Sequence, residues 1–283
     1  MRSLLAGPGV THLAGVYDPV TAALARAAGF RAAHLSGAAV AALALGLPDL
    51  GYVHGTHIAD RAATIAPALD GVPLLADADT GYGTAIHAVW TARRYAAAGV
   101  AGLHIEDQVS PKRCGHLAGK EVVDAATAAG KIQAVAEAGT GLVLVARTDA
   151  YSVTGLSDAI ERSARYVAAG ADAVFVEGVS DRDGLAAVHD ALPGVPLVVN
   201  RSEAGGPTGD GLPDEELSDL GVRLVLHPVA PLLAALEAAR AAYAAIAHAG
   251  HAGAVPRLSW QAFTALVGQP DALALDSRYG GPS

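Results

Sequence analysis

The stretch Gly102–Lys120, GLHIEDQVSPKRCGHLAGK, joins an apolar run to a polar segment that carries the only cysteine of the chain. Its start overlaps the run Ala101–Ile105, which has the length of a buried strand and stands directly before Glu106 and Asp107. A proline-containing segment with four reactive side chains follows: Lys112, Arg113, Cys114 and His116. A thiol beside potentially cationic groups is expected to have a lowered pKa, which favours proton transfer or nucleophilic attack. The alternative is a solvated basic loop with an incidental cysteine.

The same order, an apolar run that ends in polar residues, recurs along the chain. The eight runs are Thr11–Val16, Ala32–Leu35, Pro73–Ala76, Ala101–Ile105, Leu142–Ala146, Ala173–Val176, Pro196–Val199 and Val222–Leu226. Between them lie stretches of helical length: one that starts at Pro19 after the capping residue Asp18, then Ile58–Leu69, Ala85–Ala98, Val122–Ala138, Ser157–Ala169, Asp183–Ala191, Pro213–Leu220 and Pro231–Ala249. Eight strands alternating with helices predict a (β/α)8 barrel. A doubly wound open sheet is the alternative, but no Gly-x-Gly-x-x-Gly sequence follows the first strand.

The composition is typical of a soluble enzyme. The chain has 283 residues, enough for one large α/β domain, and 52% of them are hydrophobic. No run reaches the roughly 18 uninterrupted apolar residues that a membrane span needs. A net charge of −9 without a basic cluster argues against nucleic acid and membranes as partners. Because there is one cysteine and no secretory signal, we expect a cytoplasmic protein.

The C-terminal region does not fit the eight repeated units. We predict a barrel domain over residues 1–249 and a helical extension over 250–283, separated by the glycine-containing segment Gly250–Gly253. In the extension, Trp260, Phe263 and Leu266 recur at helical spacing. A helix with exposed aromatic side chains needs a surface to cover them. The pattern allows two outcomes, packing on its own barrel or docking onto a neighbouring subunit.

Three carboxylates at strand ends are candidate ligands for a metal ion. Asp77 and Asp79 stand two residues apart at one strand end, so their side chains point the same way, and Glu106 follows the neighbouring strand. Crowded carboxylates repel one another unless a cation lies among them, and Mg²⁺ suits oxygen ligands completed by water. The alternative is that Asp77 or Asp79 only caps the following helix.

Three more polar residues end the fifth, sixth and seventh runs: Arg147, Glu177 and Asn200. In a barrel these ends face one basin, where an arginine can hold a substrate carboxylate through two hydrogen bonds. Glu177 would orient that arginine or a water molecule. The alternative for Arg147 is a buried structural ion pair.

Several segments, in order, carry a family resemblance. They are Ser36-Gly37, LPDLG at Leu47–Gly51, DADTGYG at Asp77–Gly83, GLHIEDQ at Gly102–Gln108, KRCGH at Lys112–His116 and ARTDA at Ala146–Ala150. Together they resemble the isocitrate lyase and phosphoenolpyruvate mutase superfamily, and most closely its 2-methylisocitrate lyase branch. The resemblance covers about residues 14–230, which makes it far more specific than one short motif.

The resemblance implies a (β/α)8 barrel with a helix swapped between subunits, usually in a dimer of dimers, and Mg²⁺ at the strand ends. It implies that Asp79 touches the metal, with Asp77 and Glu106 holding it largely through water. Four residues would bind the 2-keto-carboxylate end of the substrate: Ser36, Gly37, Asp49 and Arg147. Cys114 would be the general acid–base that gives a proton to the departing enolate, and the loop from Lys112 to His116 would close over the substrate.

The implied activity is cleavage of a 2-methylisocitrate-like or alkylmalate-like 2-hydroxy acid into pyruvate or glyoxylate plus a carboxylic acid. Such a retro-aldol reaction needs a base for the hydroxyl, a cation near the 2-oxygen and stabilisation of the enolate. Lys112, Arg113 and His116 are expected to lower the pKa of Cys114 and to stabilise the anion. The alternatives are a phosphonomutase acting on a phosphorus-containing enolpyruvate, and a binding protein on the same scaffold. The loop cysteine favours the lyases.

Two departures from the branch concern the substrate. His34 stands where the lyases usually have a tyrosine, so it is the candidate for the hydroxyl base. After Asn200 the usual threonine segment is rearranged across residues 201–209, and Arg201 adds a cation. Because this region should face the leaving acid, we expect an acid that differs from succinate in size or charge. Alternatively, Arg201 points into the helical layer and has no effect on binding.

Overall fold

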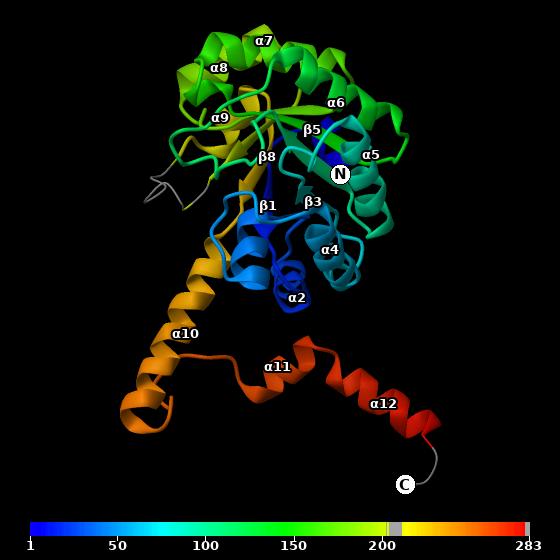
Figure 1. The fold of residues 1–283 in the computed structure, drawn as a ribbon. Helices are drawn as coiled ribbons and strands as arrows, with labels where there is room; N and C mark the ends of the chain where they lie inside the picture. Colours follow the sequence, from blue (N-terminus) through cyan, green and yellow to red (C-terminus); the bar gives the residue numbers. More distant parts are fainter. Residues whose placement is uncertain (202, 204–210, 281–283) are drawn as a thin grey trace.

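Eight parallel strands close into a barrel in chain order (Figure 1). The structure is a computed structural model that describes residues 1–201, 203 and 211–280. The strands are β1 (Thr11–Gly15), β2 (Ala32–Leu35), β3 (Leu74–Asp77), β4 (Gly102–Glu106), β5 (Val143–Thr148), β6 (Ala173–Val176), β7 (Leu197–Asn200) and β8 (Val222–His227). All eight expected strands are present within two residues of their predicted bounds. The predicted (β/α)8 fold is therefore confirmed.

Helices cover the outside of the ring and pack against two apolar clusters. They are α1 (Arg2–Ala6), α2 (Pro19–Ala27), α3 (Gly37–Val40), α4 (Gly55–Leu69), α5 (Ala85–Ala97), α6 (Ala125–Glu137), α7 (Leu156–Ala168), α8 (Arg182–Ala191) and α9 (Asp214–Asp219). Asp18 caps α2, as its position before Pro19 predicted. A third cluster, which includes Leu13, Leu75 and Phe175, fills the inside of the barrel.

Helix α6 begins three residues later than the sequence pattern indicated. The reason is that Val122 pairs with Gln108 in an antiparallel bridge, and the amide of Val123 donates to the carbonyl oxygen of Asp107. Helix formation starts only after this pair, where Asp124 accepts a hydrogen bond from the amide of Thr127. The segment between β4 and α6 is thus a loop whose two ends are joined at its base.

The chain leaves the barrel after β8. Helix α10 (Ala230–Ala249) extends away from the ring, and α11 (Trp260–Leu266) and α12 (Gln269–Tyr279) continue below it (Figure 1). We call residues 230–279 the arm. In α10 only Leu232 is buried, and no residue of α11 or α12 is buried. Helix α11 touches α2, but Trp260, Tyr243 and Tyr279 of the arm are largely exposed and are not covered by their own barrel. The division into two domains at residue 249 stays a prediction.

Helix α10 is both long and apolar. Among the described helices it alone is long and apolar enough to cross a membrane. Its apolar character comes largely from alanine, and it also carries Glu237 and Arg240, which form an ion pair on its surface. Length and composition of this kind are also found in helices that pack against other protein segments.

Candidate active site

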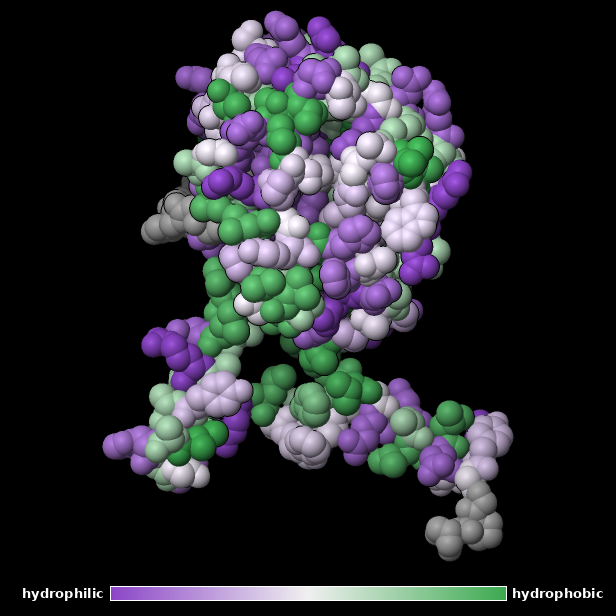
Figure 2. Space-filling model, in the orientation of Figure 1, coloured by the Kyte–Doolittle hydropathy of each residue, from purple (hydrophilic) through white to green (hydrophobic). Residues whose placement is uncertain are grey.

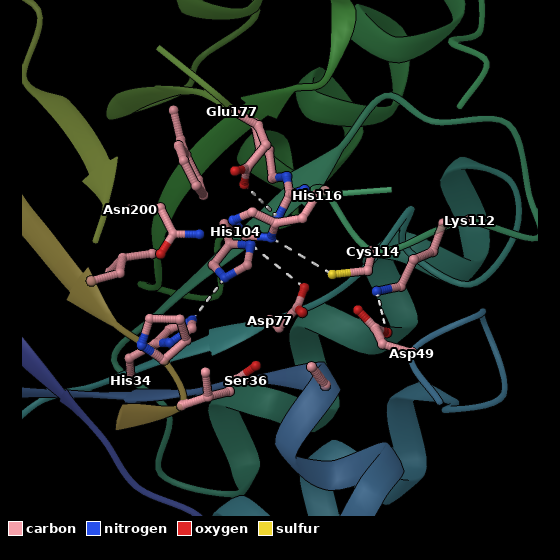
Figure 3. A pocket seen from close by; sticks show the side chains of 17 residues that line it. His34, Ser36, Asp49, Asp77, His104, Lys112, Cys114, His116, Glu177 and Asn200 are labelled. Carbon is pink, nitrogen blue, oxygen red and sulfur yellow. Dashed lines mark hydrogen bonds and ion pairs between the residues drawn. The ribbon is translucent and has the colours of Figure 1, made fainter. Parts of the chain in front are cut away.

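A small cavity of about 70 Å³ lies at the carboxyl ends of the strands (Figure 3). The residues that line it come from the ends of seven strands, β2 to β8, from the segment between β2 and α4, and from the loop after β4, which we call the β4 loop (residues 107–123). They include most of the predicted site: His34, Ser36, Asp49, Asp77, Lys112, Cys114, His116, Arg147, Glu177 and Asn200. The fold therefore brings together residues that are separated by as many as 166 positions (34 to 200) in the sequence.

Asp77 lines the cavity, and its carboxylate accepts hydrogen bonds from two backbone amides. One carboxylate oxygen accepts from the amide of Gly37 at 3.1 Å, and the other accepts from the amide of Asp79 at 3.0 Å. Burial alone would raise the pKa of Asp77, but His104, Lys112 and Arg147 hold it below the ordinary value. A methyl group on Gly37 would lie 2.7 Å from this carboxylate, so only glycine allows the contact.

Asp79 belongs to a buried group of charges at the same end. The ammonium group of Lys112 lies 3.1 Å from Asp79 and 2.5 Å from Asp49. Burial, followed by the charge of Asp77, raises the pKa of Asp79 to about 7. The capping alternative for the two aspartates does not hold, because Thr84 caps the helix that follows them.

Arg147 is held by three carboxylates. It donates to both oxygens of Asp149, at 2.9 and 3.1 Å, and it forms ion pairs of 3.2 Å with Glu106 and with Glu177. Burial lowers the pKa of Arg147 but these carboxylates, Asp149 first, raise it well above the ordinary value. The guanidinium also lies over the ring of Phe175. Arg147 is therefore both a buried ion-pair residue and a residue of the cavity wall.

The β4 loop lies over the cavity in a closed arrangement. At its base Gln108 donates to the carbonyl oxygen of Arg113 and accepts from its amide, both at 2.9 Å. The amide of Cys114 donates to the carbonyl oxygen of Asp49, which ties the tip of the loop to the opposite side of the cavity. The tip thus covers the strand ends and places Cys114 above them (Figure 3).

The pKa of Cys114 is raised and not lowered, so the prediction of a lowered pKa is wrong. Burial raises the pKa of this thiol, and Asp49 acts in the same direction, while the amide of His116, Lys112 and Arg147 act against it. Lys112 turns its charge toward Asp49 and Asp79, and Arg113 is exposed and does not line the cavity. The ring of His116 lies 3.8 Å from the sulfur.

Arg201 does not face the cavity. It donates to the carbonyl oxygen of Leu212 and lies 3.8 Å from Asp214 on the helical side of the barrel. Of the two interpretations of this residue, the described contacts therefore favour the helical layer over substrate binding. Most of the rearranged segment, residues 202 and 204–210, lies outside the described residues.

Three residues of the site were missed by sequence reasoning. His104 lines the cavity, and its Nε2 lies 3.0 Å from Nε2 of His34, while its Nδ1 lies 3.5 Å from Asp77. Burial lowers the pKa of His34 to about 3 and that of His104 to about 4, so this buried pair is neutral. Asp149 and Lys120 complete the contacts around Arg147. The alternation of side chains along β4 could have revealed His104, because it shares a face with Glu106.

Buried carboxylate oxygens beside the cavity support a cation site. Glu106 Oε1 is buried without a hydrogen-bond partner among the described residues, and Asp79 Oδ1, which also has no hydrogen bond, lies 3.1 Å from the ammonium group of Lys112. No group of three or more metal-binding side chains is arranged for direct coordination in the described part of the chain. One direct ligand, with the other carboxylates acting through water, does not require such a group. The donor set is composed of hard oxygens, so the residues fit Mg²⁺.

Comparisons with known proteins agree with this geometry. The family model described as phosphoenolpyruvate phosphomutase matches residues 1–247. The 2-methylisocitrate lyase of Bacillus subtilis is 42% identical over 234 residues, which are 83% of this chain and 76% of that protein. The 2,3-dimethylmalate lyase of Eubacterium barkeri is 38% identical over 237 residues, 83% of this chain and 81% of that protein.

Two further relatives carry different names. The chloroplastic carboxyvinyl-carboxyphosphonate phosphorylmutase of Arabidopsis thaliana is 39% identical over 237 residues, 82% of this chain and 69% of that protein. A structure of oxaloacetate acetylhydrolase with the inhibitor 3,3-difluorooxalacetate superimposes with a TM-score of 0.91. It is 34% identical and covers 100% of this chain and 96% of that one.

The closed barrel with charged side chains at its strand ends, together with relatives named as lyases, defines an enzyme. The chain belongs to the phosphoenolpyruvate mutase family, within the superfamily that also contains the isocitrate lyases. Within it, the chain is a carbon–carbon lyase.

Proposed function

We propose that the protein is a Mg²⁺-dependent lyase that cleaves a 2-hydroxy acid of the methylisocitrate or alkylmalate type into pyruvate or glyoxylate and a second carboxylic acid. The observation that carries the proposal is the position of Cys114. Its side chain lines the same cavity as Asp77 and Arg147, and it comes from the β4 loop whereas they come from the strand ends. A substrate held at the strand ends would lie between a proton donor and the carboxylate-binding groups.

The raised pKa of Cys114 fits the role of an acid. A thiol that keeps its proton at neutral pH can give it to the carbon of a departing enolate, whereas a thiolate cannot. Ser36, the amide of Gly37 and Arg147 would bind the 2-keto-carboxylate half, and the neutral His34 is the candidate to accept the hydroxyl proton. The closed loop would exclude water that could protonate the enolate at the wrong time.

Asp79 would hold Mg²⁺, with Asp77 and Glu106 holding its water molecules. When bound, the ion would supply positive charge to the 2-oxygen and the carboxylate of the substrate. Lys112 pairs with Asp79 and Asp49, and it balances part of the negative charge around that position.

The wall that would face the leaving acid favours an alkyl substituent. It is formed by Phe175, Leu226, Pro228 and Val229, with Asn200 as a polar group. Arg201 points away from it, and residues 202–210 contain no lysine or arginine. A carboxylate in this place would lack a cation from this segment of the chain, so an alkyl-substituted malate fits better than methylisocitrate.

The test is an assay of purified protein with 2-methylisocitrate, isocitrate and 2,3-dialkylmalates, with pyruvate or glyoxylate measured through a coupled dehydrogenase. We expect product that disappears with EDTA and returns with Mg²⁺, with the fastest turnover for a dialkylmalate. Cys114→Ser should lower kcat at least 10³-fold without a change in thermal unfolding. A fully active serine variant would show that the thiol is not the acid.

A phosphonomutase is the second candidate, because the Arabidopsis relative has that name. It requires a new carbon–phosphorus bond, which phosphorus NMR would detect after incubation with a carboxyphosphonoenolpyruvate. Product in this assay, with no release of pyruvate or glyoxylate in the first, would replace the lyase proposal.

We also propose that the protein is a homo-oligomer, a dimer of dimers, in which the arm is exchanged between subunits. An apolar groove of about 490 Å³ lies outside β1 and β8, beside α2, where a helix after β8 would close the outer layer. The arm of the same chain does not fill this groove, and it carries exposed apolar side chains of its own (Figure 2). A cytoplasmic location suits an enzyme that needs a free thiol.

A further inference from the structure

Lys120 is a buried lysine at the C-terminal side of the β4 loop. Only 8% of its surface is exposed, although lysine is rarely buried without a partner. Its ammonium group donates to the carbonyl oxygen of Gly115 at 2.6 Å and to Asp149 at 2.8 Å. One side chain therefore joins the tip of the loop to the end of β5.

The second partner of Lys120 is the carboxylate that orients Arg147. Asp149 is fully buried, and it accepts two hydrogen bonds from the guanidinium of Arg147. Its amide donates to Asp107, which fixes its backbone. The carboxylate of Asp149 thus lies between the cation that faces the cavity and the cation that holds the loop.

The tip of the loop also packs directly against Arg147. A methyl group on Gly115 would lie 2.6 Å from the guanidinium and 2.9 Å from Glu177. The backbone at Gly115 therefore fits against this ion pair only while Arg147 keeps its observed direction. The closed loop and the orientation of Arg147 are parts of one arrangement, and Lys120 contacts both.

We propose that Lys120 is a positioning residue that holds the β4 loop closed in register with the Arg147–Asp149 pair. Without the ammonium group, the carbonyl of Gly115 loses its buried donor in the closed loop, and one oxygen of Asp149 keeps only its hydrogen bond from Arg147. The carbonyl can recover a hydrogen bond to water when the loop opens. The equilibrium then shifts toward the open loop. The expected effect of Lys120 on turnover rests on the proposed lyase function, whereas its expected effect on loop closure is independent of that function.

The reactivity of Cys114 measures closure without a substrate, because the chain has no other cysteine. Purified Lys120→Met and the parent protein are treated with iodoacetamide, and the alkylation rate is followed by mass spectrometry. We expect the rate to rise about 10-fold or more in Lys120→Met. An unchanged rate would overturn the proposal.

A matched control is Lys131→Met. Lys131 also donates from a half-buried position to a backbone carbonyl near the barrel rim, that of Thr80, and its ammonium group donates no hydrogen bond to the tip of the β4 loop. Its replacement should leave the alkylation rate unchanged, and an equal rise in both variants would contradict a specific role for Lys120. If Lys120→Met does not fold, Lys120→Gln, which keeps one donor, is measured instead with the same expected direction.

The kinetic test uses the substrate that the lyase assay identifies. Lys120→Met should lower kcat about 10²-fold with a smaller change in KM, because the open loop allows binding but not protonation. Lys120→Arg keeps the charge and two donors, so it should recover part of kcat. Lack of turnover in the parent protein would refute the proposed function, but the alkylation result would still decide the role of Lys120.

Discussion

The barrel mouth, by which we mean the carboxyl ends of the strands around the cavity, buries charged side chains, whereas the arm exposes apolar ones. At the mouth, charged side chains are buried, and each is placed beside a charge of opposite sign or a backbone amide, as for Arg147 and Asp77. Along the arm, large apolar side chains are exposed, with Trp260 at 75% and Phe263 at 37%. A buried charge destabilises the fold unless it has an opposite charge or hydrogen-bond donors beside it. A large exposed apolar surface marks a place where another protein surface binds. The charges at the mouth are paired with other groups of the described chain, whereas the apolar side chains of the arm stay largely exposed.

Removing the central cation is the strongest test of the mouth. Arg147→Met leaves Asp149, Glu106 and Glu177 buried without it, and we expect a loss of about 3–5 kcal/mol in the free energy of unfolding. Urea denaturation followed by circular dichroism measures this loss. The control is Arg240→Met, which breaks an exposed ion pair on α10 and should cost less than about 1 kcal/mol. Similar losses for the two variants would mean that the mouth is not organised around Arg147.

The arm should respond in association and not in folding. Trp260→Ser combined with Phe263→Ser removes two exposed aromatic side chains, and we expect subunit association to weaken by about 3 kcal/mol, roughly 100-fold. Sedimentation equilibrium gives the dissociation constant. Val153→Ser, which changes an exposed apolar residue of the barrel outside the arm, serves as the control. If the double variant associates as tightly as the parent protein, the arm does not form the interface.

The smallest expected effect concerns pH. His34 has a folded-state pKa of about 3, below its unfolded value of about 6.5, so the unfolded chain binds more protons between these values. Its contribution to stability is therefore lost as the pH falls below about 6.5. Replacing His34 with Gln should reduce the loss between pH 6 and pH 5 by about 1 kcal/mol, measured by urea denaturation at both pH values. His248→Gln, at an exposed position, should leave the slope unchanged, and an equal slope in His34→Gln would contradict the buried neutral pair.

The sequence was sufficient for the barrel because each strand carries two kinds of information. An apolar run indicates a buried strand, and the polar residues after it mark the end that faces the site. Asp77, Glu106 and Arg147 were found in this way, and the structure places all three at one end of the ring. Cys114 was found from its polar neighbours in the loop, and the family resemblance added its role as general acid–base and the closure of the loop over the strand ends.

The failures share a different physical cause, which is the direction of individual side chains. Charges near Cys114 in sequence were expected to lower its pKa, but Lys112 turns toward Asp49, and burial dominates. Arg201 follows Asn200 directly, and adjacent residues of a strand face opposite sides, which places it in the helical layer. Lys120 could not be predicted at all, because its partners become neighbours only when the β4 loop closes.

The pairing of β4 with β5 sets Glu106 directly opposite Arg147. A shift of this pair by one residue would turn one set of side chains to the other face of the sheet. The carboxylate would then lose its guanidinium and remain buried, at a cost of several kcal/mol. During folding, this ion pair therefore selects the strand register: a barrel closed in a shifted register would be less stable because it would bury an unpaired carboxylate.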